Sequence, residues 1–216
     1  MAENNAINKQ AEDLLINKAS GDPYVNFQIA STDEFVIGVD DTDSDSFKIN
    51  QGGASPSAGT NTWIMTSSGE RTMALQPSFL AYSGSNQVNK TGNGTVATVI
   101  LDTEVFDQGS DFNTGTYTFT APVTGKYILE ANIYGSSIGA ATTVINSLTT
   151  SNGNYNANTG GNPNAAGAQD QPSSAVADMD AADTAYLRFV VNGLGADTAG
   201  YLGTQAYTRM SGELSC

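Results

Sequence analysis

The chain has 216 residues, a formal net charge of −14, no histidine and a single cysteine, Cys216. A surface this acidic repels phosphate backbones and anionic lipids, so no nucleic-acid binding is expected. The lack of histidine excludes His-based catalytic triads and histidine metal ligands, and one thiol cannot form an intrachain disulfide. With 23 glycines and only 14% charged residues, against an average of about 25%, the composition is typical of many short strands joined by turns. An all-β protein is predicted.

Residues 6–19 carry an apolar stripe at helical spacing, formed by Ile7, Ala11, Leu14 and Leu15. The stripe predicts a short N-terminal helix within a helical or attachment segment over residues 1–20. At about four turns this helix is marginal alone in water, so it either packs on the body or forms a trimeric coiled-coil or attachment stub. The N-terminus is polar and no long apolar run follows, so neither a signal peptide nor membrane insertion is expected.

A β-rich region follows and is predicted to span residues 21–78. Alternating apolar and polar residues predict strands at Tyr24–Ala30, Glu34–Asp40, Phe47–Asn50, Thr62–Thr66 and Arg71–Leu75. The region has few large apolar side chains for about 60 residues, too few for an independent monomeric core. We therefore expect other chains to help bury Phe27, Phe35, Ile37 and Trp63.

Three segments of this region resemble the β-rich repeat of bacteriophage tail fibres and spikes. They are DPYVNFQI (22–29), EFVIGVDDTDSDSFKI (34–49) and GTNTWIMTSSGERTMAL (59–75). In those proteins the repeat lies in the shaft, ahead of a C-terminal head or chaperone domain. The resemblance implies a fibre shaft domain here, and Pro77 marks a suitable boundary to the next domain.

The turn after Val39 is rich in aspartate and suggests a metal site at Asp41, Asp43 and Asp45. Oxygen ligands at alternate positions suit calcium. The turn lacks the glycine of an EF-hand and no glutamate closes it, which favours a solvated acidic turn. Apposition of three copies keeps the calcium hypothesis open. No other cofactor is expected.

The most informative stretch is Leu101–Leu129, where aromatic strands flank a turn at 121–125. Proline presets φ and glycine tolerates positive φ, so Pro122 and Gly125 favour the turn. The carboxylates of Asp107 and its neighbours do not lie beside a recognisable cleft, so no catalytic pair is predicted.

The order of residues in this stretch resembles the signature of the C1q/tumour-necrosis-factor-like jelly roll. The signature positions hold Leu101, Asp107, Phe112, Phe119, Gly125, Tyr127 and Leu129, with leucine in place of phenylalanine at both ends. The resemblance continues at Phe79, at 182–187 with Ala182 in place of the usual glycine, and at 210–214 with Met210 in place of phenylalanine. It covers Phe79 to Leu214 and implies a C1q-like jelly-roll β-sandwich head over residues 79–216. It also implies a homotrimer, because the family packs three jelly rolls around an axis, and it assigns Asp107 to fixing a loop.

The stretch 151–175 is dominated by Asn, Gly, Ala and Pro and is predicted to be a long loop. Loops on rigid β scaffolds often carry binding. Amide groups and one aromatic ring suit sugar hydroxyls or a protein side chain. The candidate binding residues are Asn154, Tyr155, Asn156, Asn158 and Asn162. The alternative is a solvent-filled insertion without a function.

Together these features predict a non-enzymatic structural virion protein, a homotrimeric tail or head fibre of a bacteriophage. Its N-terminal segment would contact other virion proteins, and its head would recognise a host surface glycan or protein or bridge virion components. The protein would be made in the host cytoplasm and assembled into the virion. Two alternatives remain: a secreted or cell-surface C1q-like, lectin-like recognition protein, and a glycan-cleaving spike, for which 216 residues leave little room.

Overall fold

A computed structural model describes residues 8–10, 13–160 and 167–215, and every regular element among them is a β-strand. The chain divides into two compact units, Met1–Leu75 and Gln76–Cys216. We call them the N-terminal unit and the jelly-roll unit. Ser78, the last residue of the predicted shaft domain, is the first residue of a jelly-roll strand.

The N-terminal unit begins with a small hairpin of β1 (Asn8–Gln10) and β2 (Asp13–Leu15). The helix predicted over residues 6–19 is therefore wrong for these residues, while 6, 7, 11 and 12 lie outside the described residues. A stripe of about four turns is marginal as an isolated helix. Pairing of the two short strands satisfies the backbone instead.

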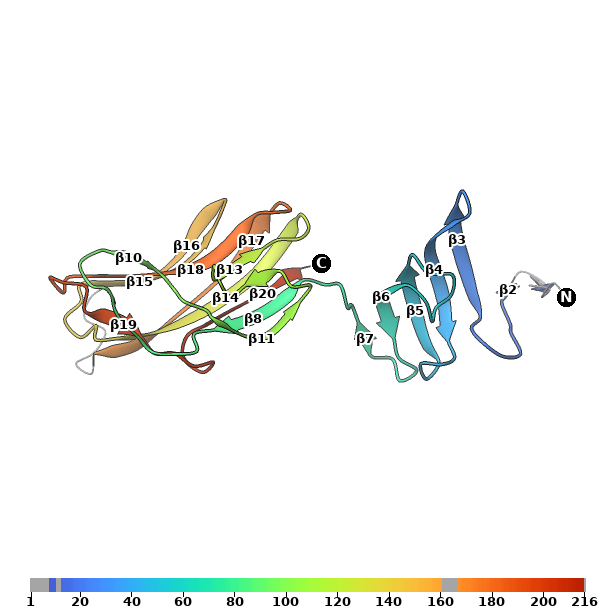
Figure 1. Ribbon diagram of the computed structural model, residues 1–216, viewed down its shortest axis with the longest axis horizontal. Coiled ribbons are helices and arrows are strands. Elements are labelled where there is room, and N and C mark those ends of the chain that lie inside the picture. Colours follow the sequence, from blue (N-terminus) through green and yellow to red (C-terminus); the bar gives the residue numbers. More distant parts are fainter. Residues whose placement is uncertain (1–7, 11–12, 161–166, 216) are drawn as a thin grey trace. The chain divides into compact units, whose positions relative to one another are not determined.

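A five-stranded antiparallel meander forms the body of this unit, in the order β3-β4-β5-β6-β7 (Figure 1). Its strands are β3 (Tyr24–Ile29), β4 (Thr32–Asp40), β5 (Ser46–Gln51), β6 (Thr60–Met65) and β7 (Arg71–Thr72). Each of the predicted strands is present, although the last ends at Thr72 and does not reach Leu75. Alternation of apolar and polar residues was a sufficient signal, because it matches the two faces of a sheet.

Two sheets make up the jelly-roll unit. Its strands are β8 (Ser78–Tyr82), β9 (Gln87–Thr91), β10 (Val96–Thr98), β11 (Thr103–Gln108), β12 (Phe112–Asn113), β13 (Thr118–Thr120), β14 (Gly125–Ser136), β15 (Thr143–Thr150), β16 (Gly153–Gly160), β17 (Ala168–Met179), β18 (Thr184–Asn192), β19 (Ala199–Tyr201) and β20 (Arg209–Ser215). The β14 sheet has the order β11-β8-β20-β14-β19-β9, with β17 on the other edge of β14. The β15 sheet has the order β12-β13-β18-β15-β16, with β10 beside β18.

The chain passes from one sheet to the other as a jelly roll does. From β13 it crosses to β14, returns to β15 and β16, crosses to β17, returns to β18 and ends in β20. Strands far apart in sequence thus become neighbours, as β14 and β20 do in Figure 1. This crossing pattern of antiparallel strands is the double-sheet jelly roll, and it confirms the predicted fold class.

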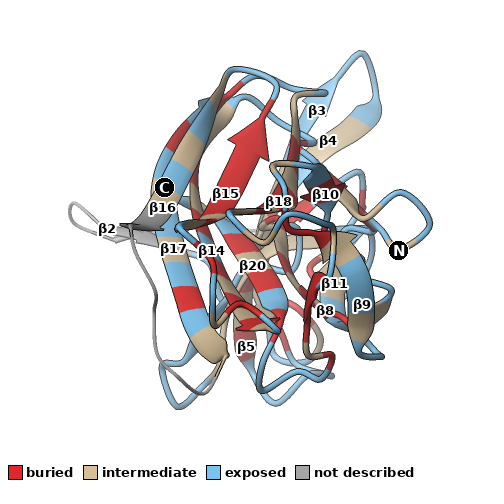
Figure 2. Cartoon of the chain, turned by 90° about the vertical axis from the view of Figure 1, so that its left-hand side faces the viewer, coloured by how far each residue is buried: buried red, intermediate tan, exposed pale blue. Residues whose placement is uncertain are grey.

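One contiguous apolar core lies between the two sheets. Figure 2 shows β15 as an almost continuously buried strand. The largest fully buried side chains come from both sheets and from the segments that join them: Tyr127, Tyr201, Phe79, Phe119, Phe189, Leu101, Leu129, Ile133, Ile138, Leu148, Met179 and Leu187. The two sheets and their connecting segments therefore bury this core completely within one copy of the chain.

The signature residues meet at one end of this core. The ring of Phe79 stacks on Phe112 at 5.0 Å and on Phe119 at 4.7 Å between centroids. Phe119 in turn meets Tyr127 edge-on at 5.4 Å. At Gly125 the Leu214 side chain of β20 occupies the space beside the backbone: a Cβ atom added there would lie 2.5 Å from Leu214 Cδ1, so this leucine would have to shift. The signature residues therefore share a structural role: their side chains pack against one another in the core.

The long loop predicted over residues 151–175 is mostly absent. Residues 153–160 form β16, which pairs with β15 along its whole length, and β17 begins at Ala168 and pairs with β14. Residues 161–166 lie outside the described residues. Asn, Gly and Ala have low β propensity, but propensity is weak beside pairing with a neighbouring strand.

Candidate functional site

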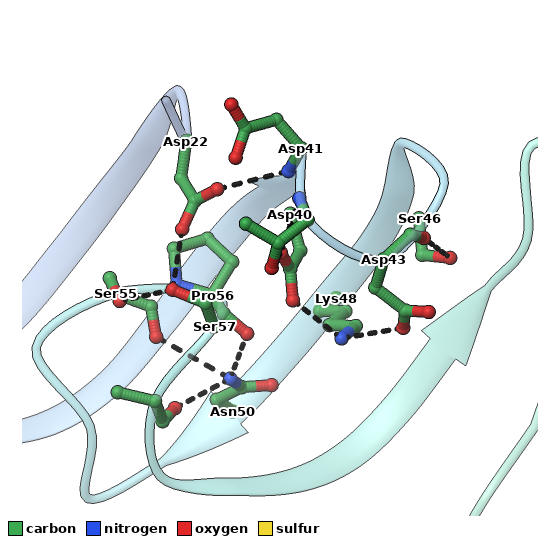
Figure 3. Close-up of polar contacts among 12 residues, drawn as sticks. Asp22, Asp40, Asp41, Asp43, Ser46, Lys48, Asn50, Ser55, Pro56 and Ser57 are labelled. Atoms are coloured by element: carbon green, nitrogen blue, oxygen red, sulfur yellow. Dashed lines mark hydrogen bonds and ion pairs between the residues drawn. The ribbon is translucent and has the colours of Figure 1, made fainter. Parts of the chain in front are cut away.

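The acidic turn joins β4 to β5 and is organised around a buried lysine. Lys48 and Asp40 are only 5% and 2% exposed. The Lys48 Nζ lies 2.7 Å from Asp40 Oδ2 and 2.7 Å from Asp43 Oδ2 (Figure 3). The turn itself is closed by the Ser46 amide, which donates to the Asp43 carbonyl at 3.1 Å. The ammonium group neutralises charge that would otherwise repel within the turn.

Both partners of this ion pair have shifted pKa values. Burial tends to raise the pKa of Asp40, but hydrogen bonds from Lys48 and Thr42 outweigh it, so the pKa is lowered. Burial likewise tends to lower the pKa of Lys48, but its hydrogen bonds to Asp40 and Asp43 and their charges raise it. Each group therefore keeps its charge over a wider pH range than it would in an unfolded chain.

Calcium was predicted at Asp41, Asp43 and Asp45, but the structure groups these residues differently. Carboxylate oxygens of Asp22, Asp40 and Asp41 lie within 4.8 Å of one another. Asp43 is turned to Lys48, and Asp45 is exposed in the turn. Only one of the predicted residues thus belongs to the group.

The oxygens of this group already accept hydrogen bonds from the protein. Asp22 Oδ1 accepts from the Asp41 amide at 3.0 Å, and Asp22 Oδ2 accepts from Ser57 Oγ at 2.8 Å (Figure 3). Asp40 accepts from Thr42 and Lys48. Calcium takes six to eight oxygen ligands, and the ammonium of Lys48 competes for the same carboxylates. The donor set fits a hydrogen-bonded acidic turn better than an ion site, and calcium binding stays a prediction.

Four of the five candidate binding residues lie on the edge strand β16. Asn154 and Asn156 are exposed on β16, while Tyr155 is half-buried against the core. Asn158 is also in β16, opposite Ile145, and Asn162 lies outside the described residues. The tyrosine ring thus contributes to packing, and the exposed amides of Asn154 and Asn156 are available to a ligand.

A shallow depression of about 820 Å³ extends over the outer face of the β14 sheet and around its edge. It is lined by side chains of β14, β16, β17 and β20: Glu130, Ala131, Asn132, Tyr155, Asn156, Ala157, Pro172, Ser173, Ser174, Arg209 and Ser211. Tyr155 and Asn156 are thus brought together with residues that the sequence analysis did not select. Residues such as Glu130, Ser174 and Ser211 are far apart in the sequence and become neighbours only through strand pairing, in which Glu130 lies between the two serines. The sequence alone therefore gave no signal for them.

A smaller hollow of about 250 Å³ adjoins the depression on the same face. Phe106 and Ile128 line it, and Ile128 pairs in register with Val176. Phe106 is 49% and Val176 61% exposed. The outer face of the β14 sheet therefore combines an apolar strip with a polar depression.

The carboxylates near the signature have structural roles. Asp107 accepts hydrogen bonds from the amides of Asp111 at 3.1 Å and Phe112 at 3.0 Å. Burial, and then the charge of Asp107, raise the pKa of Asp111. The role assigned to Asp107 by the signature, fixing a loop, is thus confirmed.

Comparison with known proteins gives matches in structure alone. No protein-family model and no curated protein matches the sequence. The globular domain of zebrafish complement 1qA protein aligns at 14% identity and a TM-score of 0.48, over 65% of this chain and 98% of that one. Murine APRIL aligns at 10% identity and 0.47, over 65% and 99%, and Eiger TNF from S. frugiperda at 12% and 0.41, over 65% and 94%.

In the part of the chain that the structure describes, no helix is long and apolar enough to cross a membrane. The sheet order confirms a jelly roll in the C-terminal unit, and at these identities the likeness to solved structures concerns the fold alone.

Proposed function

We propose that the protein is a non-enzymatic homotrimeric fibre or appendage of a bacteriophage particle. The observation that carries the proposal is the combination of two units, a single β-sheet with shaft-like sequence and a C1q/TNF-like jelly roll. In this arrangement the N-terminal segment attaches to other virion proteins. The jelly-roll unit is the head that recognises a host surface glycan or protein or bridges virion components.

The outer face of the β14 sheet supports trimerisation of the head. Exposed Phe106 and Val176 lie on it together with half-buried Ile128. A face that exposes apolar side chains beside hollows is suited to burial by another protein surface. Light scattering on the purified protein is expected to give about three times the monomer mass of 22.4 kDa. A stable monomer at micromolar concentration would contradict the trimer.

Location separates the proposal from its alternative. Antibodies against the chain are expected to label appendages on purified phage particles from infected cultures. Label confined to a cell surface or a secreted fraction would instead favour a C1q-like recognition protein of a cell. Either result leaves the fold unchanged, so the experiment tests the biological setting alone.

Ligand recognition by the head is proposed at the exposed amides of β16. Asn154 and Asn156 offer donors and acceptors that suit sugar hydroxyls. A double variant, Asn154→Ala with Asn156→Ala, is expected to weaken binding to host cells at least tenfold while leaving the oligomer intact. Gln205→Ala, which removes an exposed amide outside β16, is the matched control and is expected to bind as the unchanged protein does.

A further inference from the structure

The five-stranded sheet of the N-terminal unit is covered on its polar face. Val36, Asp40, Lys48 and Asn50 lie on this face, and each is at least nine-tenths buried. The cover is the loop between β5 and β6: Asn50 Nδ2 donates to the carbonyls of Pro56 at 2.6 Å and Ala58 at 2.7 Å (Figure 3). The chain thus uses its own loop to bury polar side chains.

The opposite face of the same sheet is apolar and incompletely covered. Strand register places Phe27 opposite Phe35, Ile37 opposite Ile49, and Ile49 opposite Trp63. The full set, which we call the apolar face, is Val25, Phe27, Phe35, Ile37, Val39, Phe47, Ile49, Trp63 and Met65. None of these side chains is charged. Phe27 is 55% and Phe35 46% exposed, and the others are half-buried.

This arrangement is the reverse of what a lone sheet in water requires. Hydrophobic burial is the main stabilising contribution in folding, and an isolated sheet would place its loop over the apolar side. Among the described residues of the N-terminal unit, the buried apolar side chains are Val36 on the sheet and Pro56 in the covering loop. The loop is held on the polar face by hydrogen bonds, so the apolar face is left for another surface.

The area matches that of a specific interface. About half of Phe27 and Phe35 and smaller parts of the other members leave on the order of 500 Å² of apolar surface open. This is near the upper end of what a monomer usually exposes in one patch. Two such faces in contact bury on the order of 1,000 Å², the area at which a specific interface becomes credible.

We propose that the apolar face is a self-association surface that packs against the same face of other copies of this chain. A second copy is the occupant because the nine side chains of the apolar face carry no charge in a chain of net charge −14. Arg71, in register with Met65 on the edge strand β7, is a charged residue at the border of this face. Copies that repel elsewhere can approach through such a surface. The inference rests on the proposed trimer, which holds the copies together at high effective concentration. It adds a second contact between copies, independent of the jelly rolls.

Trp63 provides a local readout, because it is the only tryptophan of the protein and lies on the apolar face. It packs edge-on against Phe47, with ring centroids 5.9 Å apart. In the full-length protein, Trp63 emission is expected to be blue-shifted and its quenching by acrylamide several-fold weaker than that of free indole. Acrylamide is neutral, so the acidic surface does not bias the measurement.

Two variants test which surface shields Trp63. Phe27→Ser with Phe35→Ser removes exposed side chains of the apolar face and is expected to raise the quenching constant at least twofold and shift the emission to the red. Phe27→Ser alone, on the edge strand β3, is the milder variant should the double variant fold poorly. Leu75→Ser is the matched control, since Leu75 is equally exposed at 55% and lies outside the face. It is expected to change nothing.

Light scattering on the same samples separates this inference from the proposed function. A trimer whose shielded Trp63 becomes accessible in the serine variants supports both. A trimer with an exposed Trp63, or with shielding that the variants leave unchanged, overturns the inference alone. A dimer with a shielded Trp63 supports the apolar face and overturns the trimer. A monomer overturns both, and a shielded Trp63 in that monomer would mean that another part of the same chain covers the face.

Discussion

In the jelly-roll unit two sheets cover each other, and the large apolar side chains between them are fully buried within one copy. In the N-terminal unit a single sheet buries polar side chains under its own loop and leaves its apolar face open. The difference shows that one chain can contain a fold that buries its own large apolar side chains beside a sheet that leaves its apolar face open. Whether the apolar face of a sheet is buried within one copy depends on a second layer of structure, more than on the number of strands.

The largest effect is expected in the sandwich core. Phe119 is 1% exposed and contacts Phe79 and Tyr127. Phe119→Ala should lower the free energy of unfolding of the jelly-roll unit by about 3–5 kcal/mol, because it opens a cavity between two fixed sheets. Denaturant unfolding followed by circular dichroism measures it. Val123→Ala, at a position 45% exposed, is the control and should cost little. A loss of under about 1 kcal/mol at Phe119 would contradict a self-sufficient core.

In the N-terminal unit the largest effect is expected at the polar face. Lys48→Met leaves Asp40 buried without its cation and should destabilise this unit by about 2 kcal/mol. Trp63 fluorescence reports the unfolding of this unit alone, since the protein has no other tryptophan. Lys126→Met removes an exposed ion pair, 3.3 Å from Asp178, and is expected to have little effect. Equal effects of the two substitutions would mean that the buried ion pair is no stronger than a surface pair.

The same ion pair predicts a pH dependence of the N-terminal unit. The pKa of Asp40 is lowered from 3.8, so its contribution is present above about that pH and is lost as the pH falls through the folded value. The pKa of Lys48 is raised from 10.5, so its contribution is present below that pH and is lost as the pH rises further. The free energy of unfolding of this unit, obtained from thermal unfolding followed at Trp63, should be constant between these limits. Outside them it should fall by about 1 kcal/mol per pH unit. Asp40→Asn should flatten the acid limb, and an unchanged acid limb would show that other carboxylates cause it.

Sequence patterns indicated the jelly roll well because its signature residues determine their own surroundings. Phe79, Phe112 and Phe119 stack directly, and Asp107 binds amides four and five residues ahead. Such contacts join residues whose types are specific, so a resemblance in their order is informative.

The rest depended on pairing that local sequence does not encode. Residues 153–160 look like a loop, and only their alignment with β15 makes them a strand. The aspartates of the acidic turn suggested a metal, whereas Lys48, on the next strand, forms ion pairs with two of the carboxylates, Asp40 and Asp43. The depression on the β14 sheet depends on strand register as well, so none of its residues from β14, β17 or β20 was selected.

A smaller effect is expected where the jelly roll departs from its signature. Ala182 stands in the place of the usual glycine and has a φ of 75°. Its amide donates to the Ala121 carbonyl at 2.8 Å, which holds it in the left-handed region. Ala182→Gly should raise the free energy of unfolding of the jelly-roll unit by about 1 kcal/mol, because only glycine adopts this conformation without strain. Ala181→Gly, at the preceding exposed position, should bring no gain. A destabilised Ala182→Gly variant would show that the turn tolerates alanine without cost.

The smallest effect is expected from calcium, and it tests whether the acidic turn is complete without an ion. Lys48 and neighbouring amides already satisfy Asp40 and Asp22, so chelation should leave the unfolding temperature at Trp63 unchanged within about 1 °C. If calcium bound, a concentration of 100 times its dissociation constant would add about 2.7 kcal/mol, which amounts to several degrees. Magnesium at equal ionic strength controls for screening of the acidic surface. A rise of several degrees with calcium alone, abolished by Asp41→Asn, would show that the ion displaces these hydrogen bonds and that the N-terminal unit is stabilised by a metal.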